Sequence, residues 1–439
     1  MLRSFLLLAF VAAPLCGAAG AAQPAEPNFT LAEVESAMRP YEGPIVQPIA
    51  RDSLRGKVVA GYQGWFTAPG DGSGQGWRHY SKQGKFEPGQ CSIDLWPDVS
   101  EFSDAEKVVT PFRHADGSRA FVFSSHNRET VLRHFRWMQD YELDGVFVQR
   151  FVVATRGPRD LRHCNTVLAH CREGANRYGR VYAVMYDLSG LQAGGTQFLI
   201  DDWKRLVDRM RLGRDEADKA YLRHDGKPVV AVWGVGFNDG RGYTLAECDK
   251  LLDFLRDDPR YGGNTLLVGV PTGWRTLDRD AAKETALHEV LRHADIVSPW
   301  TVGRYHSPET AARHAERDWK ADLAHCRGQK QDYLPVVFPG FSWHNMRPES
   351  PSNVIPRLKG EFLRSQFIAA KRVGAEMIYV AMFDELDEGT AIFKCTNAPP
   401  IGAGTFVDYE GLPSDAYLRL TGWAGRYLRG ETTDLPAAR

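Results

Sequence analysis

Four carboxylates crowd into five positions of the stretch MFDELDEGTAIF, Met382 to Phe393, where Asp384, Glu385, Asp387 and Glu388 directly follow an apolar run. Carboxyl groups held close together raise one another's pKa, so such a group keeps a proton available near neutral pH. Glycoside cleavage usually needs two carboxyl groups, one that protonates the leaving oxygen and one that acts as base or nucleophile. If the chain turns helically here, the β-carbons of Glu385 and Glu388 come within about 6 Å. We therefore expect these two glutamates to be catalytic.

Two other interpretations of the acidic stretch stay open on spacing alone. Asp387 and Glu388 are residue types that cap the start of a helix, where their charge meets the helix dipole. Carboxylate oxygens are also the preferred ligands of calcium, so the group is a candidate calcium site. The elements that position the stretch must decide between these interpretations and catalysis.

Eight runs rich in Val, Ile and aromatic residues, bounded by turns, alternate with segments of helical period. The eight runs are Val58 to Tyr62, Gly145 to Arg150, Val181 to Tyr186, Val229 to Trp233, Leu266 to Val270, Ile296 to Trp300, Leu334 to Phe338, and Met377 to Phe383. Eight β-α units predict an α/β protein with the (β/α)8 TIM barrel, whose parallel strands are buried on both faces. A doubly wound open sheet is the alternative. No linker or repeat divides the chain, so we expect one domain over residues 23–439.

The connection between the first strand and its helix is unusually long, about sixty residues from Phe66 to Asn127. It holds the hairpin sequence VVTPFRHADGSRAFVFSS, whose turn we expect at Asp116-Gly117. A loop of this length in a compact domain is usually functional, as a lid or a binding wall. We expect it to wall the active site.

The active site of such a barrel lies at the carboxyl ends of its strands. The candidate substrate-binding residues are those that follow the strands or lie in the long loop: Tyr62, Gln63, Trp65, Trp77, His79, Trp96, Gln149, Arg150, Tyr186, Asp187, Trp233, Trp274, Arg275, Trp300, Tyr305, Trp343 and His344, with Asp384 and Asp387 as orienting or binding groups. Seven of the eleven tryptophans are among them, and the other four, Trp137, Trp203, Trp319 and Trp423, lie on predicted helices. Sugars stack their C–H faces on aromatic rings and hydrogen-bond through their hydroxyls, so this composition favours a carbohydrate ligand.

At these residues the sequence resembles glycoside hydrolase family 99, the endo-acting α-mannosidases and α-mannanases, and the related family 71/99-like proteins. DELDEGTAIF is similar to the Glu-Trp-His-Glu-Gly-Thr segment that ends the family's last strand, so Glu385 and Glu388 fall on its two glutamates. The likeness continues through AGYQGWF, MYDLSG, KPVVAVWG, GVPTGWR, SPWTVGRY and PGFSWHN, in order around the strands. It covers most of the chain.

The resemblance implies a retaining mechanism. Glu385 would act as a base on the sugar 2-hydroxyl, which attacks the anomeric carbon to give a 1,2-anhydro sugar. Glu388 would protonate the leaving group and later activate water. The sequence departs from the family at Leu386-Asp387, which replaces the Trp-His pair between the glutamates, and in the first strand, which continues Gly-Tyr-Gln-Gly. Both changes fall where the reacting sugar would lie.

Several alternatives were weighed. A glycosidase of other specificity, such as an α-1,3-glucanase, and a non-catalytic carbohydrate-binding barrel both stay open. HEVLRH, from His288 to His293, spaces its histidines five apart, so they point about 140° from each other on a helix and cannot share a zinc ion. Ser342 in GFSWH lacks the final glycine of a nucleophile elbow. No phosphate-binding loop is present, and no metal or cofactor is predicted.

The N-terminal sequence predicts export. Arg3 precedes an apolar run from Phe5 to Leu15, and Ala19-Gly20-Ala21 is a candidate peptidase site, so residues 1–22 are expected to be a cleaved signal peptide and the protein periplasmic or secreted. Cys16 follows Leu15, a poor match to a lipobox, which disfavours a lipoprotein. Six cysteines remain, which permits disulfides of unknown pairing. The net charge of -1 argues against a nucleic-acid partner, and the oligomeric state is not predicted.

Overall fold

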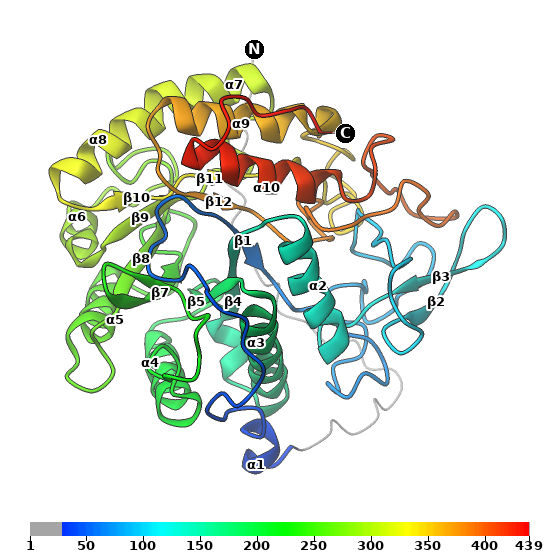
Figure 1. Cartoon of the computed structure of the whole chain (residues 1–439), viewed down its shortest axis with the longest axis horizontal. Coiled ribbons are helices and arrows are strands. Elements are labelled where there is room, and N and C mark those ends of the chain that lie inside the picture. The colour runs from blue at the N-terminus through cyan, green and yellow to red at the C-terminus, as the bar shows by residue number, and fades with distance from the viewer. Residues whose placement is uncertain (1–28, 439) are drawn as a thin grey trace.

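A parallel sheet that curls around a central axis forms the core of the computed structural model, which describes residues 29–438 (Figure 1). Paired strands follow the order β10 (Asp332–Tyr333), β9 (Ile296–Pro299), β8 (Thr265–Val270), β7 (Lys227–Trp233), β5 (Val181–Asp187), β4 (Gly145–Phe151), β1 (Val58–Tyr62), β12 (Ile378–Val380) and β11 (Val336–Val337). A short strand, β6 (Arg223–His224), pairs with the start of β7. The predicted signal peptide and Cys16 lie outside the described residues.

The sheet closes into a barrel through β10 and β11, which are the two ends of one interrupted strand. β10 pairs with β9, β11 pairs with β12, and β12 pairs with β1. Between them, Leu334 donates its N–H to Val297 at 2.9 Å, and Pro335 accepts a bond from the N–H of Tyr379 at 3.0 Å. Proline has no N–H to donate, which explains the interruption. The predicted (β/α)8 barrel is therefore confirmed, and each predicted strand contains or overlaps an observed one.

Helices surround the barrel (Figure 1). They are α2 (Arg128–Asp140), α3 (Pro158–Tyr178), α4 (Thr196–Arg205) with the π-helical turn η2 (Leu206–Met210), α5 (Leu245–Asp257), α6 (Ala286–Val290) with η3 (Leu291–His293), α7 (Pro308–His314) with η4 (Ala315–Trp319) and α8 (Lys320–Gly328), η5 (Leu358–Gly360) with α9 (Glu361–Arg372), and α10 (Ala416–Arg429). Short helices α1 (Leu31–Val34) and η1 (Val152–Thr155) complete the set. Trp137, Trp203 and Trp319 are buried, as their helical spacing predicts. None of the described helices is long and apolar enough to cross a membrane.

The long loop after β1 contains the predicted hairpin, formed by β2 (Val108–Arg113) and β3 (Arg119–Val122). Gly117 has a φ of 82°, which suits glycine at this turn. The hairpin lies beside the segment that follows β12 (Figure 1), and Thr396 donates its N–H to the carbonyl of Trp96 at 3.0 Å. The connections after the first and eighth strands thus pack together.

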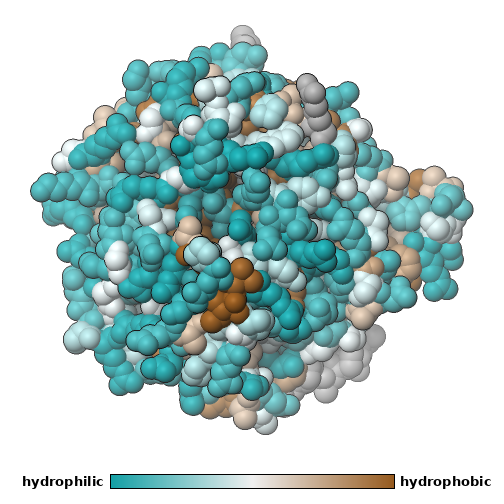
Figure 2. Space-filling view, viewed as in Figure 1, coloured by the Kyte–Doolittle hydropathy of each residue, from teal (hydrophilic) through white to brown (hydrophobic). Residues whose placement is uncertain are grey.

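The segment before β1 covers the amino ends of the strands. Its Leu54 is fully buried and donates its N–H to Nδ1 of His224 at 3.1 Å, and its Arg51 reaches the carbonyl of Asp218. In Figure 1 this segment is the blue chain that crosses the centre of the view. Figure 2 shows the surface of the same face, which is mainly hydrophilic with a small hydrophobic patch near its centre. The amino end of the barrel is therefore covered, which leaves the carboxyl end as the place for a site.

Candidate active site

The strand register decides which residues at the carboxyl ends point into the barrel. Gly61 of β1 pairs with Phe147 of β4, so two residues further on Gln63 and Gln149 lie on the same face of the sheet. Gln149 in turn pairs with Met185 of β5, which places Asp187, two residues later, on this face as well. Side chains alternate between the two faces of a strand. The side chain of Tyr379 on β12 crosses this face, since a Cβ added to Gly61 would lie 2.1 Å from the Tyr379 hydroxyl. This shared face is therefore the one that lines the inside of the barrel.

The same alternation turns three predicted binding residues outward. Tyr62 hydrogen-bonds His134 of α2 at 2.9 Å, while Arg150 and Tyr186 both bind the carboxylate of Asp202 in α4, at 2.6 and 2.7 Å. All three side chains are buried between the sheet and the helices. The prediction that Tyr62, Arg150 and Tyr186 bind substrate is wrong, because each is one residue out of phase with the inner face.

Four further predicted binding residues serve the packing of loops and helices. Trp274 and Arg275 both bond Asp322 of α8, at 3.3 and 2.8 Å, and the hydroxyl of Tyr305 donates to Gln366 of α9 at 2.9 Å. Trp96 is buried in the first loop. Their polar groups are paired with residues outside the acidic stretch, so the structure does not support these four predictions.

Other aromatic predictions have mixed outcomes. Trp77 packs on Phe86 and Tyr80 within the first loop, with ring centroids 5.0 and 6.1 Å away, and makes no contact with the acids. Trp343 is half-buried against Phe341. Trp233 and Trp300 meet edge to face at 5.3 Å on the inner face of the barrel. Of these four tryptophans, Trp233 and Trp300 face the inside of the barrel.

The acidic stretch folds back on itself directly after β12. It forms a turn rather than the expected helix, with the N–H of Gly389 reaching Leu386 and that of Thr390 reaching Glu385 at 3.2 Å. A Cβ at Gly389, whose φ is 63°, would lie 2.9 Å from the carbonyl of Ser342, so only glycine fits. The turn replaces helix geometry as the means of bringing Glu385 and Glu388 together, and the helix-cap interpretation is excluded.

Each acid has a different set of partners. Asp384 accepts the N–H groups of Gln63 and Gly64 at 2.7 and 2.9 Å, which ties the eighth strand to the first. Glu385 accepts one bond from Nε2 of Gln63 and one from the hydroxyl of Thr390, both 2.6 Å. These donors stabilise the ionised forms of both acids.

The other two acids lack such support. Asp387 meets Nδ1 of His79 through one oxygen at 3.1 Å, while its second oxygen, Oδ1, is buried without a partner. The Glu388 side chain makes no hydrogen bond to any residue that the structure describes, and it is 7% exposed. The two glutamates are therefore unequal: Glu385 is held by two donors and Glu388 by none.

Burial raises the pKa of every acid in the stretch. The pKa of Asp384 rises to about 7, and those of Glu385 and Asp387 rise to about 8, with the charge of Asp387 adding to the effect of burial at Glu385. Burial, then the charge of Glu385, raises the pKa of Glu388 well above its ordinary value. Glu388 thus has a raised pKa and none of the hydrogen-bond donors that favour ionisation at Glu385, and the cluster can both give and take a proton near neutral pH.

The side of the acids toward the first loop is formed by a stacked pair. The His79 ring lies parallel to Trp65, with centroids 3.9 Å apart and 4° between the planes, while its Nδ1 faces Asp387. Burial lowers the pKa of His79 well below its usual value, so the imidazole is neutral. The predicted residues Gln63, Trp65, His79, Asp384 and Asp387 are thus brought together with the two glutamates.

Two residues of the site were missed by the sequence predictions. The hydroxyl of Tyr379 accepts a bond from Gln149 at 2.8 Å, and its surroundings include the charges of Glu385 and Asp187. Arg241 lies over the rings of Trp233 and Phe237, 5.3 and 5.0 Å from their centroids. Side chains alternate between the two faces of a strand, so the position of Tyr379 in the last strand could have marked it as facing the inside of the barrel. Arg241 lies in an irregular loop, where no sequence pattern marks it.

Four buried polar atoms around the mouth have no hydrogen-bond partner: Oε1 of Gln63, Nε1 of Trp65, Nε1 of Trp233 and Oδ1 of Asp387. Buried polar groups are nearly always paired in folded proteins, so unpaired ones need an explanation. A ligand rich in hydroxyl groups, which both donate and accept, would satisfy such a mixture of donors and acceptors. Burial also raises the pKa of the nearby Asp187 to about 6.

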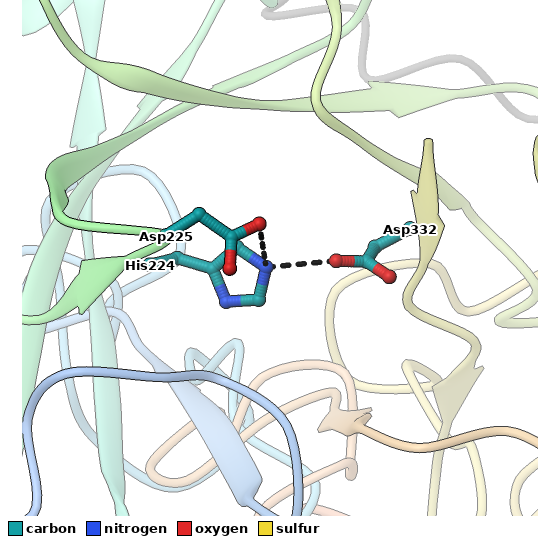
Figure 3. A group of neighbouring side chains, drawn as sticks. All are labelled: His224, Asp225 and Asp332. Atoms are coloured by element: carbon teal, nitrogen blue, oxygen red, sulfur yellow. Dashed lines mark hydrogen bonds and ion pairs between the residues drawn. The ribbon is translucent and has the colours of Figure 1, made fainter. Parts of the chain in front are cut away.

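A metal site is not favoured at either end of the barrel. Among residues 29–438 the only group of three possible ligands within 4.8 Å of one another is His224, Asp225 and Asp332 (Figure 3), so the acidic stretch is not such a group. His224 accepts a bond at Nδ1 and donates from Nε2 to Asp332 at 2.8 Å, while Arg55 pairs with both aspartates. The cluster is an ion-pair network with no free nitrogen lone pair.

The histidines of HEVLRH bond apart from each other, as their spacing predicts. His288 meets the carbonyl of Trp274, and His293 meets Asp249. All six described cysteines are free thiols, and five of them are buried.

Comparison with known proteins gives matches of two kinds. Residues 305–429, which include the acidic stretch, match Glycosyl hydrolase family 99. Glycoprotein endo-α-1,2-mannosidase-like proteins of Danio rerio and Mus musculus are 29% and 30% identical over 116 and 118 residues, which is 26% of this chain and 26% and 25% of theirs. Glycoprotein endo-α-1,2-mannosidase of Rattus norvegicus is 26% identical over 121 residues. The chain thus aligns with about a quarter of the length of these relatives.

The structural likeness extends much further along the chain. The GH99 endo-α-mannosidase of Bacteroides thetaiotaomicron superposes with a TM-score of 0.63 at 17% identity, covering 87% of this chain and all of that one. A glycoside hydrolase-like protein superposes with a TM-score of 0.51 at 14% identity, over 89% and 98% of the two chains. The resemblance to glycoside hydrolase family 99 is therefore confirmed, by sequence over residues 305–429 and by fold over the whole barrel.

Proposed function

We propose that this protein is a glycoside hydrolase that cleaves an α-linked, mannan-like glycan with retention of configuration. The observation that carries the proposal is the inequality of Glu385 and Glu388. When two neighbouring carboxyl groups have surroundings that give them different pKa values, one can act as an acid and the other as a base. The family match over residues 305–429 and the endo-α-mannosidase fold support the substrate class.

The surroundings of each glutamate assign its role. Glu385, with donors on both oxygens, is the more readily ionised and takes the proton of the sugar 2-hydroxyl. The 2-oxygen attacks the anomeric carbon, giving a 1,2-anhydro sugar, while Glu388 donates its proton to the leaving oxygen. Glu388 then removes a proton from water, which opens the anhydro ring at the anomeric carbon as Glu385 returns its proton to the 2-oxygen. Neither glutamate forms a covalent bond to the sugar.

The polar and aromatic groups of the mouth suit a sugar. Trp233 and Trp300 offer ring faces and edges, and the four unpartnered polar atoms offer two donors from indole N–H groups and two oxygen acceptors. Sugar hydroxyls would complete these hydrogen bonds on binding. Asp387, where the family has histidine, places a carboxyl oxygen beside the reacting unit and is expected to alter which sugar is accepted.

Export and domain organisation are part of the proposal. A cleaved signal peptide at residues 1–22 would deliver a single barrel domain, residues 23–439, to the periplasm or the medium. N-terminal sequencing of the mature protein tests this, and a mature chain that begins at Met1 would contradict it.

The test of function is hydrolysis of a panel of α-linked polysaccharides that includes α-mannans and an α-1,3-glucan. We expect cleavage of α-mannan with a retained anomer in the first product, measured by NMR. Glu385→Gln and Glu388→Gln should each lower kcat by at least about a hundredfold, while Glu216→Gln, an exposed control, should not. Unchanged turnover in Glu388→Gln, or an inverted product, would refute the mechanism. Binding without turnover by the wild-type protein would instead favour a carbohydrate-binding barrel.

A further inference from the structure

A cavity lies between segments that hydrogen-bond the backbone of the acidic stretch. It has a volume of about 220 Å³ and is lined by residues of the first loop, of the segment after β11 and of the segment after β12, among them Lys82, Cys91, His344, Asn345 and Thr405. This volume is many times what one water molecule needs, so the cavity can hold a small polar ligand. Its rim is exposed at Gly89 and Thr405, so a ligand can enter.

The cavity is rigidly joined to the catalytic turn by Asp94. The carboxylate of Asp94 accepts bonds from the Ser342 hydroxyl and from the N–H groups of His344 and Asn345, at 2.5, 2.8 and 2.8 Å. Its own N–H donates to Leu386, between the two glutamates, at 2.9 Å.

A second connection runs through Ser342, whose N–H donates to the carbonyl of Glu388 at 2.9 Å. His344 follows two residues later, a span of at most about 7 Å. The His344 wall of the cavity and the catalytic turn are therefore joined through short backbone connections.

The charge of this cavity is opposite to that of the catalytic turn. Lys82 donates one bond to the carbonyl of Asn345 at 3.2 Å, which leaves two of its three N–H groups free. No Asp or Glu is among the residues that line the cavity, and the one hydrogen bond of the Lys82 ammonium within the described residues goes to a carbonyl oxygen, not to a carboxylate. The side-chain amide of Asn345 donates to the carbonyl oxygens of Ile93 and Thr405. It therefore forms part of the cavity wall and makes no hydrogen bond to the Lys82 ammonium.

The backbone fixes Lys82 in place. Lys82 and Lys85 exchange backbone bonds at 3.0 and 3.1 Å, and Ser81 bridges to Cys91. The His344 ring is likewise held, because its Nδ1 donates to the carbonyl of Ser350 at 2.7 Å. An unopposed cation on a fixed backbone beside a cavity is suited to a negatively charged group.

We propose that this cavity is a subsite for an anionic sugar unit of the substrate, one that carries a carboxylate or a phosphate or sulfate ester, with Lys82 as the residue that recognises the charge. The inference rests on the proposed function in that it places the anionic unit on the same glycan as the bond that is cleaved. Glu385 and Glu388 would act on a bond adjacent to a charged unit, and the enzyme would prefer charged glycans to neutral ones.

The test is a binding measurement that needs no turnover. The full mature chain carrying Glu388→Gln is titrated calorimetrically with glucuronate, mannose 6-phosphate, methyl α-mannoside and inorganic phosphate. We expect both charged sugars to bind more tightly than methyl α-mannoside and more tightly than phosphate alone. Adding Lys82→Gln should weaken both charged sugars about tenfold and leave the neutral sugar unchanged.

Two controls make the result specific to the cavity. Lys85→Gln removes an exposed lysine of the same turn and should change nothing, and Lys82→Arg should restore most of the affinity. Equal affinity for charged and neutral sugars, or an unchanged affinity in Lys82→Gln, would overturn the proposal. Phosphate binding as tightly as mannose 6-phosphate would also overturn it, because the site would then recognise a bare anion. A protein that hydrolyses no glycan refutes the proposed function but leaves this binding result intact.

Discussion

At the residue scale, Thr390 sets the proton affinity of Glu385. Its hydroxyl donates to Oε2 of Glu385 at 2.6 Å and stabilises the ionised carboxylate. Removing this donor in Thr390→Val should raise the pKa of Glu385 further above about 8. The base must be ionised, so the acid limb of the kcat/KM profile should move to higher pH, by about one unit.

The pH profile of Thr421→Val is the matched control, because the hydroxyl of Thr421 bonds Tyr417 within its own helix, α10. An acid limb that stays in place in Thr390→Val, or that moves equally in Thr421→Val, would contradict the role of Glu385 as base.

His79 is the second residue whose substitution tests a role in positioning the acidic turn. It meets Asp387 at 3.1 Å and stacks on Trp65, so it holds both the turn and the first loop in place. We expect His79→Ala to lower kcat by about ten- to a hundredfold, since small displacements of catalytic groups cost this much. His114→Ala, on the exposed hairpin, should retain full kcat. A His79→Ala enzyme with normal kcat and a raised KM would show that His79 only contacts substrate.

The residues of the site were only partly predictable. The sequence places Glu385 and Glu388 after the last strand, where their spacing predicts catalysis, whereas residue type alone at a strand end suggests Tyr62 and Arg150. Their register with Gln63 and Gln149 depends on strand pairing, which a one-residue shift inverts. Thr390 and Tyr379 acquire their roles only through contacts that the folded chain creates.

At the scale of elements, the connections after β1 and β12 form one wall. Trp96 and Phe112 from the first pack on Phe406 from the second, with ring centroids 5.5 and 6.3 Å away. Lys394 after β12 also pairs with Glu101 in the first loop. The length of the first loop and its hairpin could be predicted, but its partner lies about three hundred residues away and no local pattern marks it.

Trp96 therefore should govern the stability of this wall. Its ring is 1% exposed and its Nε1 donates to Phe121 at 3.0 Å. We expect Trp96→Ala to lower the free energy of unfolding by about 3–5 kcal/mol, measured by denaturant titration. Trp343→Ala removes a half-buried ring and should cost clearly less. Equal losses in the two variants would show that the wall does not depend on Trp96.

At the scale of the whole molecule, the two ends of the barrel carry opposite electrostatic arrangements. At the amino end, Arg55 pairs with Asp225 and Asp332, and its hydrogen bond lowers the pKa of Asp225. At the carboxyl end, burial raises the pKa of all four acids of the stretch. In such barrels the carboxyl end serves catalysis and the amino end serves stability. The architecture that separates these roles was predictable from eight β-α units, while the pairing of charges within each end was not.

This separation has a consequence for stability against pH. Asp384, Glu385 and Asp387 have pKa values of about 7, 8 and 8 in the folded protein, against about 4 when unfolded. A raised folded pKa contributes stability that is fully present below the unfolded pKa and is lost as pH rises through the folded one. The acids of the turn should therefore lower the free energy of unfolding progressively between about pH 4 and pH 8.

Burial raises the pKa of Glu388 as well, so replacing this ionisable carboxyl by an amide should relieve part of that loss. We expect the free energy of unfolding of Glu388→Gln to exceed that of the wild-type protein by about 1–2 kcal/mol at pH 8, measured by denaturant titration. The difference should be much smaller at pH 4.5. Glu216→Gln, exposed and distant from the turn, should show no pH-dependent change. Catalytic groups often destabilise the fold that holds them, because the reaction needs proton affinities that burial and like charge create. A Glu388→Gln protein less stable than wild type at pH 8 would mean that Glu388 is paired in the folded state and is not the proton donor.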